Sequence, residues 1–241
     1  MRVLDLFSGI GGFALAGQWV WGDDHEIVGF CEIDKYCHKV LNKNFPGVPI
    51  YEDIRKLNGK DFKNIDLITG GFPCQDISVA KPDGKGIDGN RSGLWSEMYR
   101  VLGVVRPKFA IIENVANIIN RGLERVICDL TRIGYDCEWQ MLEGYQVGLP
   151  HKRRRIFIIA YPNSLRQKYN FQKKIQGFEP VPRQLYRSTQ DIVGRWDLCE
   201  PLVYRSGHGI PNWVDRIKGL GNAIVPQVAY KVMKMIKECD E

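Results

Sequence analysis

The stretch RVLDLFSGIGGFA (residues 2–14) joins a short apolar run to a glycine-rich turn. The run at 2–7 has the length and composition of a buried strand. The glycines after it let the backbone turn tightly and approach a ligand at the N-terminus of a following helix. Gly9, Gly11 and Ala14 match the dinucleotide-binding spacing, and Glu32 follows at the distance of a ribose-binding acid. The stretch therefore predicts a nucleotide-type cofactor, either a dinucleotide or S-adenosylmethionine.

Strand and helix patterns alternate beyond this stretch. Further strands are predicted at 26–32, 48–53, 65–71, 108–115, 137–142 and 155–161, and helices at 34–44, 93–105, 116–133 and 224–237. This alternation predicts an α/β fold in which a mostly parallel, Rossmann-like sheet carries helices on both faces. Ligands of such sheets bind beyond the carboxyl ends of the strands, so residues that directly follow a strand are the candidates for a site.

The composition divides the chain into three parts. We expect a main domain over 1–161, a small irregular lobe over 162–215 that is rich in Pro, Gln, Arg and Tyr, and a C-terminal segment over 216–241. Residues 151–195 hold eleven lysines and arginines against two acids. Such a concentration suits binding to a phosphate backbone, although a solvated loop would also tolerate it.

Several classes of protein are disfavoured by the sequence. The seven cysteines have no regular spacing, which favours free thiols over a disulfide framework. Cys31, Cys37 and His38 lie close together, but the rest of a zinc-ligand set is missing, so no metal is expected. The sequence contains no apolar window of membrane-spanning length and its start does not resemble a signal peptide, so we expect a cytoplasmic protein that does not associate with membranes.

A cysteine follows the fourth predicted strand, in the sequence GGFPCQ (70–75). At the ligand end of a parallel strand Cys74 is a candidate covalent catalyst, although a buried, inert thiol is the simpler interpretation of the residue alone. The polar segment 75–93 is long for a simple connection and is typical of an active-site lid. Glu113 stands at the end of the next strand, and Arg153 and Arg155, two residues apart at the start of a later strand, face one side.

Together these residues resemble the cytosine-C5 DNA methyltransferase family. The matching blocks occur in order and span nearly the whole chain: DLFSGIGGF (5–13), CEID (31–34), EDI (52–54), GGFPCQDIS (70–78), ENV (113–115), HKRRR (151–155) and GLGNAIVP (219–226). A dinucleotide-dependent dehydrogenase explains none of the later blocks. The resemblance implies S-adenosylmethionine as the cofactor and double-stranded DNA as the partner.

The resemblance also implies roles for individual residues. Cys74 would add to C6 of a cytosine flipped out of the helix, and C5 would then take the methyl group before Cys74 is expelled. Glu113 would contact N3 and the amino group of the base. Arg155 would bind the base O2, with Arg153 supporting the pocket. The chemistry agrees, because cytosine C5 is a poor nucleophile until a thiolate adds at C6, and the base must leave the stack to be reached.

For the cofactor, the resemblance implies that Glu32 takes the ribose hydroxyls and Asp53 the adenine amine. Helix capping is the alternative role for both acids. Ile33 and Ile54 would flank the adenine ring. The remaining residues assigned to the cofactor pocket are Phe7, Gly9, Gly11, Phe72, Leu94 and Asn222. The C-terminal helix is expected to pack back against the region of the first strand.

The chain departs from the family pattern in two places. The arginine block usually begins with Gln, and here it begins with His151, whose role stays open. The lobe over 162–215, which in the family reads the DNA sequence, is short. We therefore expect a short or relaxed recognition site, or help from a second molecule, in a compact enzyme like those carried by phages and prophages. A monomer is expected, with a dimer as the alternative.

Two other functions stay open on the sequence alone. The first is the same chemistry on RNA, as in the tRNA-directed branch of the family, although the extra cysteine motif of that branch is not evident. The second is a non-catalytic DNA-binding relative, which the presence of Cys74, Glu113, Arg155 and Asn222 disfavours. For the enzyme itself, restriction-modification or protection of phage or host DNA is the expected role.

Overall fold

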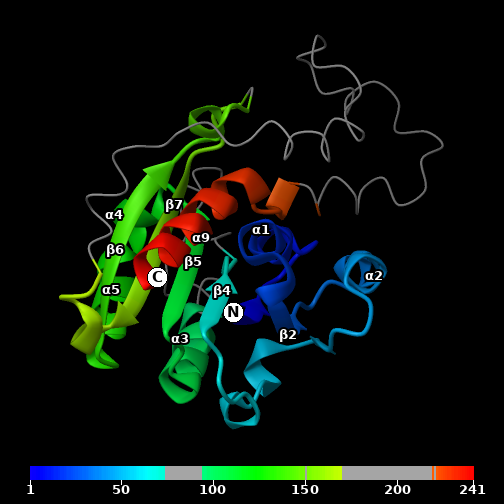
Figure 1. Cartoon of the computed structure of the whole chain (residues 1–241), viewed down its shortest axis with the longest axis horizontal. Coiled ribbons are helices and arrows are strands. Elements are labelled where there is room, and N and C mark those ends of the chain that lie inside the picture. The colour runs from blue at the N-terminus through cyan, green and yellow to red at the C-terminus, as the bar shows by residue number, and fades with distance from the viewer. Residues whose placement is uncertain (74–93, 150, 170–218, 220) are drawn as a thin grey trace.

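The computed structural model describes residues 1–73, 94–149, 151–169, 219 and 221–241 (Figure 1). Its centre is a seven-stranded sheet in the order β3-β2-β1-β4-β5-β7-β6. All pairings among the first five strands are parallel, and β7 is antiparallel to both of its neighbours. The strands are β1 (Arg2–Leu6), β2 (Glu26–Cys31), β3 (Ile50–Tyr51), β4 (Leu67–Gly70), β5 (Phe109–Val115), β6 (Tyr135–Leu142) and β7 (Arg155–Pro162). The predicted α/β class with a mostly parallel sheet is confirmed.

Helices cover both faces of the sheet. The α-helices are α1 (Gly12–Trp21), α2 (Lys35–Asn44), α3 (Leu94–Val105), α4 (Ile118–Arg121), α5 (Leu123–Arg132) and α9 (Pro226–Asp240). Single 3-10 turns lie at Gly22–Asp24, Ile54–Lys56, Gly59–Asp61, Gly144–Val147 and Asn163–Leu165. Figure 1 shows α9, in red, beside α1, in blue, so the two ends of the chain pack together as expected.

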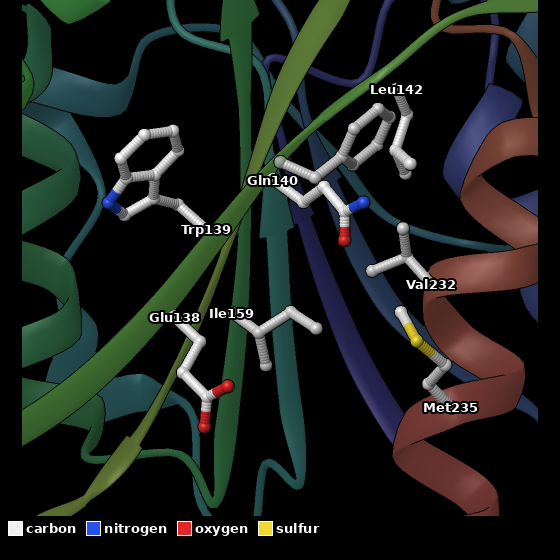
Figure 2. Close-up of a pocket in the computed structure, with 8 residues that line it drawn as sticks. Glu138, Trp139, Gln140, Leu142, Ile159, Val232 and Met235 are labelled. Carbon is white, nitrogen blue, oxygen red and sulfur yellow. The ribbon is translucent and has the colours of Figure 1, made fainter. Parts of the chain in front are cut away.

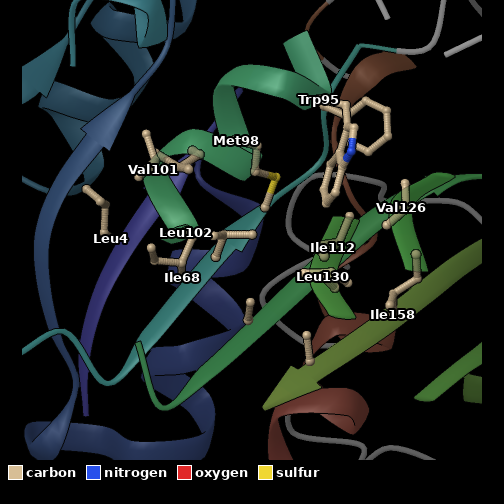
Figure 3. Packing of buried hydrophobic residues seen from close by; sticks show 14 of the residues in the cluster. Leu4, Ile68, Trp95, Met98, Val101, Leu102, Ile112, Val126, Leu130 and Ile158 are labelled. Carbon is tan, nitrogen blue, oxygen red and sulfur yellow. The ribbon is translucent and has the colours of Figure 1, made fainter. Parts of the chain in front are cut away.

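The two faces of the sheet have separate apolar cores, because successive side chains along a strand point to opposite sides. Ile112 packs with the helices α3 and α5, where Figure 3 shows it among Trp95, Val126 and Leu130. Its neighbour Ile111 packs on the other side with α1 and α9. The central strands are buried on both faces, which explains their continuous apolar composition.

Two predicted elements are wrong in their extent. The sequence pattern predicted a single helix over 116–133, but the structure has α4 and α5 separated at Gly122. Glycine has the lowest helix propensity after proline, which agrees with the break between the two helices at this residue. The predicted strand at 48–53 shortens to the two residues of β3, since Asp53 begins a 3-10 turn. Pro226 does occupy the first turn of α9.

A polar cluster joins the end of β7 to the C-terminus. Tyr169 is 2% exposed, packs its ring on Phe109 and Tyr161, and donates a hydrogen bond of 3.1 Å to Asp240. Asp240 also forms an ion pair with Lys108. Residues 163–169 therefore pack on the main domain, while most of the predicted lobe, 170–215, lies outside the described residues.

Candidate active site

The glycine-rich turn lies at the carboxyl end of β1, as predicted. Phe7, Gly9 and Gly11 all have positive φ, at 54°, 53° and 87°. Glycine adopts this conformation without strain, and at Gly11 an added Cβ would also lie 2.7 Å from the ring of Phe45. An added Cβ at Gly12 would overlap the side chain of Ile224. The C-terminal end of α2 therefore packs against the turn at Gly11, and the segment that precedes α9 packs against it at Gly12.

Glu32 ties this turn to the end of β2. Its two carboxylate oxygens accept hydrogen bonds of 2.8 Å from the backbone N–H groups of Gly9 and Asp34. Asp34, not Glu32, caps α2. Each carboxylate oxygen can accept more than one hydrogen bond, so this arrangement is compatible with a further donor such as a ribose hydroxyl.

Asp53 has the capping role that the sequence left as its alternative. Its Oδ1 accepts hydrogen bonds from the backbone N–H of Arg55 at 3.0 Å and from its Nε at 2.9 Å. These bonds to Arg55 lower the pKa of the Asp53 carboxyl. The carboxylate therefore stays charged near neutral pH, and its remaining lone pairs can still accept a hydrogen bond from an amine.

The other residues assigned to the cofactor pocket differ in exposure. Ile33 is 67% exposed, so its side chain is accessible to a ligand. Ile54 and Phe72, in contrast, are buried in the core on the side of α3. Leu94 packs on the edge of that core, and Asn222 is exposed.

Asp5 is a buried carboxyl beside the turn that the sequence did not single out. Its Oδ1 accepts a hydrogen bond of 2.6 Å from the hydroxyl of Thr69 on β4. Burial raises the pKa of Asp5 to about 7, and the nearby charge of Glu32 adds to this effect. The two central strands are thus joined by a polar contact directly below the glycine-rich turn.

Glu113 and Arg155 meet at the carboxyl end of β5. Arg155 Nε lies 3.0 Å from Glu113 Oε1, and their side chains are 23% and 15% exposed. Burial raises the pKa of Glu113, while the charges of Arg155 and Arg153 act in the opposite direction. The structure therefore brings together the two residues that the family resemblance assigned to the flipped-out cytosine.

This pair lies against the chain that leads to Cys74. An added Cβ at Gly71 would be 2.8 Å from Glu113 Oε2, so the glycine allows the carboxylate to approach the GGFPC backbone. Asn114, whose side chain the sequence analysis did not assign, donates a hydrogen bond of 3.3 Å to the carbonyl oxygen of Phe72. Cys74 itself lies outside the described residues, which end at Pro73 on this side.

The other two arginines of the block make contacts that differ from the contact of Arg155. Arg153 has a φ of 21°, and its guanidinium donates hydrogen bonds of 2.8 and 2.7 Å to the carbonyl oxygens of Gly221 and Ala223. It therefore holds the residues Gly221 and Ala223 of the GLGNAIVP segment. Arg154 forms an ion pair with Glu143, so its charge is engaged within the protein.

His151 packs against the turn after β6. An added Cβ at Gly144 would lie 2.5 Å from His151 Nδ1, and the backbone N–H of Gly144 donates a hydrogen bond to the carbonyl oxygen of Lys152. Burial, followed by the charge of Arg153, lowers the pKa of His151. The imidazole is therefore neutral near pH 7, which makes it a polar but uncharged replacement for glutamine.

A small groove of about 10 Å³, room for roughly one water molecule, lies elsewhere, between β6, β7 and α9 (Figure 2). Its lining is mostly apolar: Glu138, Trp139, Gln140, Leu142, Phe157, Ile159, Val232 and Met235. None of the predicted site residues that the structure describes lines this groove. The candidate site is therefore at the strand ends and not in the groove.

Comparison with known proteins identifies the family of this chain. A family model described as C-5 cytosine-specific DNA methylase matches residues 1–199. The chain belongs to this family. The Type II methyltransferase M2.BsuMI of Bacillus subtilis is 40% identical over 237 residues, which cover 92% of this chain and 53% of the relative. M.HhaI of Haemophilus parahaemolyticus, also a Type II methyltransferase, is 33% identical over 198 residues, covering 80% of this chain and 57% of the relative.

A solved structure agrees with this assignment to the methylase family. The S. pombe Dnmt2 methyltransferase has a TM-score of 0.57 and 27% identity, over 68% of this chain and 50% of that one. The chain thus spans about half the length of the relatives that it matches. In the described part of the chain, no helix is both long and apolar enough to cross a membrane.

Proposed function

We propose that the chain is a DNA (cytosine-5-)-methyltransferase that uses S-adenosylmethionine and forms a covalent adduct between Cys74 and C6 of a flipped-out cytosine. The observation that carries the proposal is the Glu113–Arg155 pair, which lies against Gly71 in the sequence that leads to Cys74. Membership of the methylase family supports it.

The residues around the glycine-rich turn fit S-adenosylmethionine. Phe7, Gly9 and Gly11 would hold its adenosine and methionine parts, and the carboxylates of Glu32 and Asp53 would accept hydrogen bonds from the ribose and the adenine amine. Exposed Ile33 would cover the ring. When bound, this cofactor supplies an electrophilic methyl group.

The residues of the chain itself would activate the base. The Cys74 thiolate adds to C6, and Glu113 contacts N3 and the amino group so that the ring can accept the electron pair. Arg155 holds O2 and stays next to Glu113. Transfer of the methyl group to C5 would release S-adenosylhomocysteine. Loss of the C5 proton to water and expulsion of the Cys74 sulfur would then restore the aromatic ring. The raised pKa of Glu113 suits this role, because a carboxyl that holds its proton can donate to N3.

We further propose that duplex DNA is the macromolecular partner. Along the sequence, residues 162–215 would supply a recognition lobe between a main domain over 1–161 and a C-terminal segment over 216–241, although 163–169 pack on the main domain. The excess of lysine and arginine over 151–195 supports contacts with phosphates. Because this lobe is short, the recognition site is expected to be short or relaxed. The Type II methyltransferases among the relatives favour a role in restriction-modification or DNA protection.

A labelling experiment tests this function. The chain is incubated with methyl-labelled S-adenosylmethionine and either duplex DNA of mixed sequence or tRNA. We expect label in DNA, at the C5 position of cytosine, and none in tRNA. Label only in tRNA would assign the same chemistry to RNA, and no label in DNA of any sequence would refute the proposal.

A further inference from the structure

A buried carboxylate on α5 holds the first aromatic ring of α3. Asp129 is 3% exposed and accepts a hydrogen bond of 3.0 Å from the indole Nε1 of Trp95. Arg125 and Arg132 each donate to the same carboxylate at 2.8 Å. Trp95 is itself 2% exposed, and Figure 3 shows it in the core between α3 and the residues Val126 and Ile112.

The indole in turn contacts the chain that leads to the proposed nucleophile. The rings of Trp95 and Phe72 have centroids 5.5 Å apart at an angle of 47°, and Phe72 is 1% exposed. Phe72 continues directly into Pro73 and Cys74, and Trp95 directly follows Leu94 of the proposed cofactor pocket. The contact between Phe72 and Trp95 therefore connects the described residues just before position 74 with those just after position 93.

The three hydrogen bonds to Asp129 differ in how far they can stabilise the orientation of the Trp95 ring. The side chains of Arg125 and Arg132 are 53% and 66% exposed, so each guanidinium also bonds with water, and each is only one of two cations beside the carboxylate. The indole N–H is buried, so loss of its acceptor leaves a donor without water or protein to bond. A packing role alone would need only an aromatic ring at position 95. The buried indole–carboxylate bond instead fixes the orientation of that ring.

We propose that Asp129 is a positioning residue for Cys74. Through its bond to Trp95 it fixes the ring on which Phe72 rests, and so fixes the backbone from which the nucleophile extends. This inference rests on the proposed function, because it assigns the purpose of the contact to the reaction of Cys74. Small displacements of a reacting group lower rates strongly, so the effect is expected in the rate of the covalent step.

The test compares four variants in single-turnover adduct formation with DNA that contains 5-fluorocytosine, at saturating DNA and S-adenosylmethionine. We expect Asp129→Ala and Trp95→Phe to lower the rate constant about tenfold, since both remove the indole–carboxylate bond. Asp129→Asn keeps an oxygen that can accept the indole N–H, and Arg132→Ala keeps the bond intact. Both are expected to stay within about threefold of the unchanged chain.

Hydrogen exchange of the peptide 67–73 provides a readout that does not depend on activity. We expect faster exchange in Asp129→Ala and Trp95→Phe, and no change in the peptide that covers β2. The proposal is overturned if Asp129→Ala keeps the rate and the exchange of the unchanged chain, or if Asp129→Asn loses as much rate as Asp129→Ala. If the unchanged chain forms no adduct, the proposed function fails instead, and the exchange comparison still tests the positioning.

Discussion

Glu113→Gln is expected to lower the rate of methyl transfer roughly 100-fold or more, the usual effect of removing a general acid–base group. The amide can still accept a hydrogen bond from Arg155, but it cannot supply a proton to N3 of the base. Because the shape of the side chain and the contact with Gly71 are kept, the free energy of unfolding should change by only about 1 kcal/mol. Single-turnover methylation, with thermal unfolding alongside, measures both quantities.

Asp240→Asn is the matched control for this substitution. It also neutralises a partly buried carboxylate that is paired with a cation, but at the far end of α9. We expect Asp240→Asn to reduce the free energy of unfolding about as much as Glu113→Gln does. The rate of methyl transfer should stay within about twofold, since the lost ion pair lies at the end of α9, away from the candidate site. Equal rates for Glu113→Gln and the unchanged chain would remove Glu113 from the mechanism.

Arg155→Met should cause the largest loss of stability among the site residues. It leaves the Glu113 carboxylate largely buried without its ion-pair partner, which costs about 3–5 kcal/mol for fully buried pairs. We expect about 2–3 kcal/mol here because both side chains keep some exposure to water. Chemical denaturation near pH 8 measures the change in the free energy of unfolding.

The pH dependence of this loss follows from the pKa of Glu113. Burial already raises that pKa, and removal of Arg155 takes away the main opposing charge, so it rises further. A carboxyl whose pKa is higher in the folded state than in the unfolded state destabilises the fold as the pH rises. The deficit of Arg155→Met should therefore be smaller near pH 5 than near pH 8. Adding Glu113→Gln should remove most of this dependence, and a deficit that is constant with pH would contradict the assigned partnership.

The fold could be predicted from the sequence because its strongest signals are local. The apolar runs at 2–7, 65–71 and 108–115 became the central strands β1, β4 and β5, since a strand that is buried on both faces is apolar throughout. The break at Gly122 was missed because the apolar spacing of α5 continues across it. The glycine turn followed from a motif at a strand end. The family resemblance assigned Glu113 and Arg155 to the same cytosine, but their ion pair was not predicted.

The remaining features of the site depend on contacts between distant parts of the chain. Trp95 and Asp129 are 34 positions apart, and neither belongs to a recognisable motif. Arg153 bonds to backbone carbonyl oxygens of the segment before α9, and nothing in the side chains of Gly221 or Ala223 indicates this. Such contacts arise from packing in three dimensions, so a sequence pattern that describes one element at a time does not contain them.

The most direct test of the proposed mechanism is covalent trapping at Cys74. Duplex DNA that contains 5-fluorocytosine is incubated with the chain and S-adenosylmethionine, and the products are separated under denaturing conditions. The fluorine at C5 cannot leave as a proton, so the sulfur cannot be expelled and the adduct accumulates. We predict a stable protein–DNA adduct for the unchanged chain and for Cys128→Ala, and none for Cys74→Ala. An adduct formed by Cys74→Ala would contradict the role of Cys74.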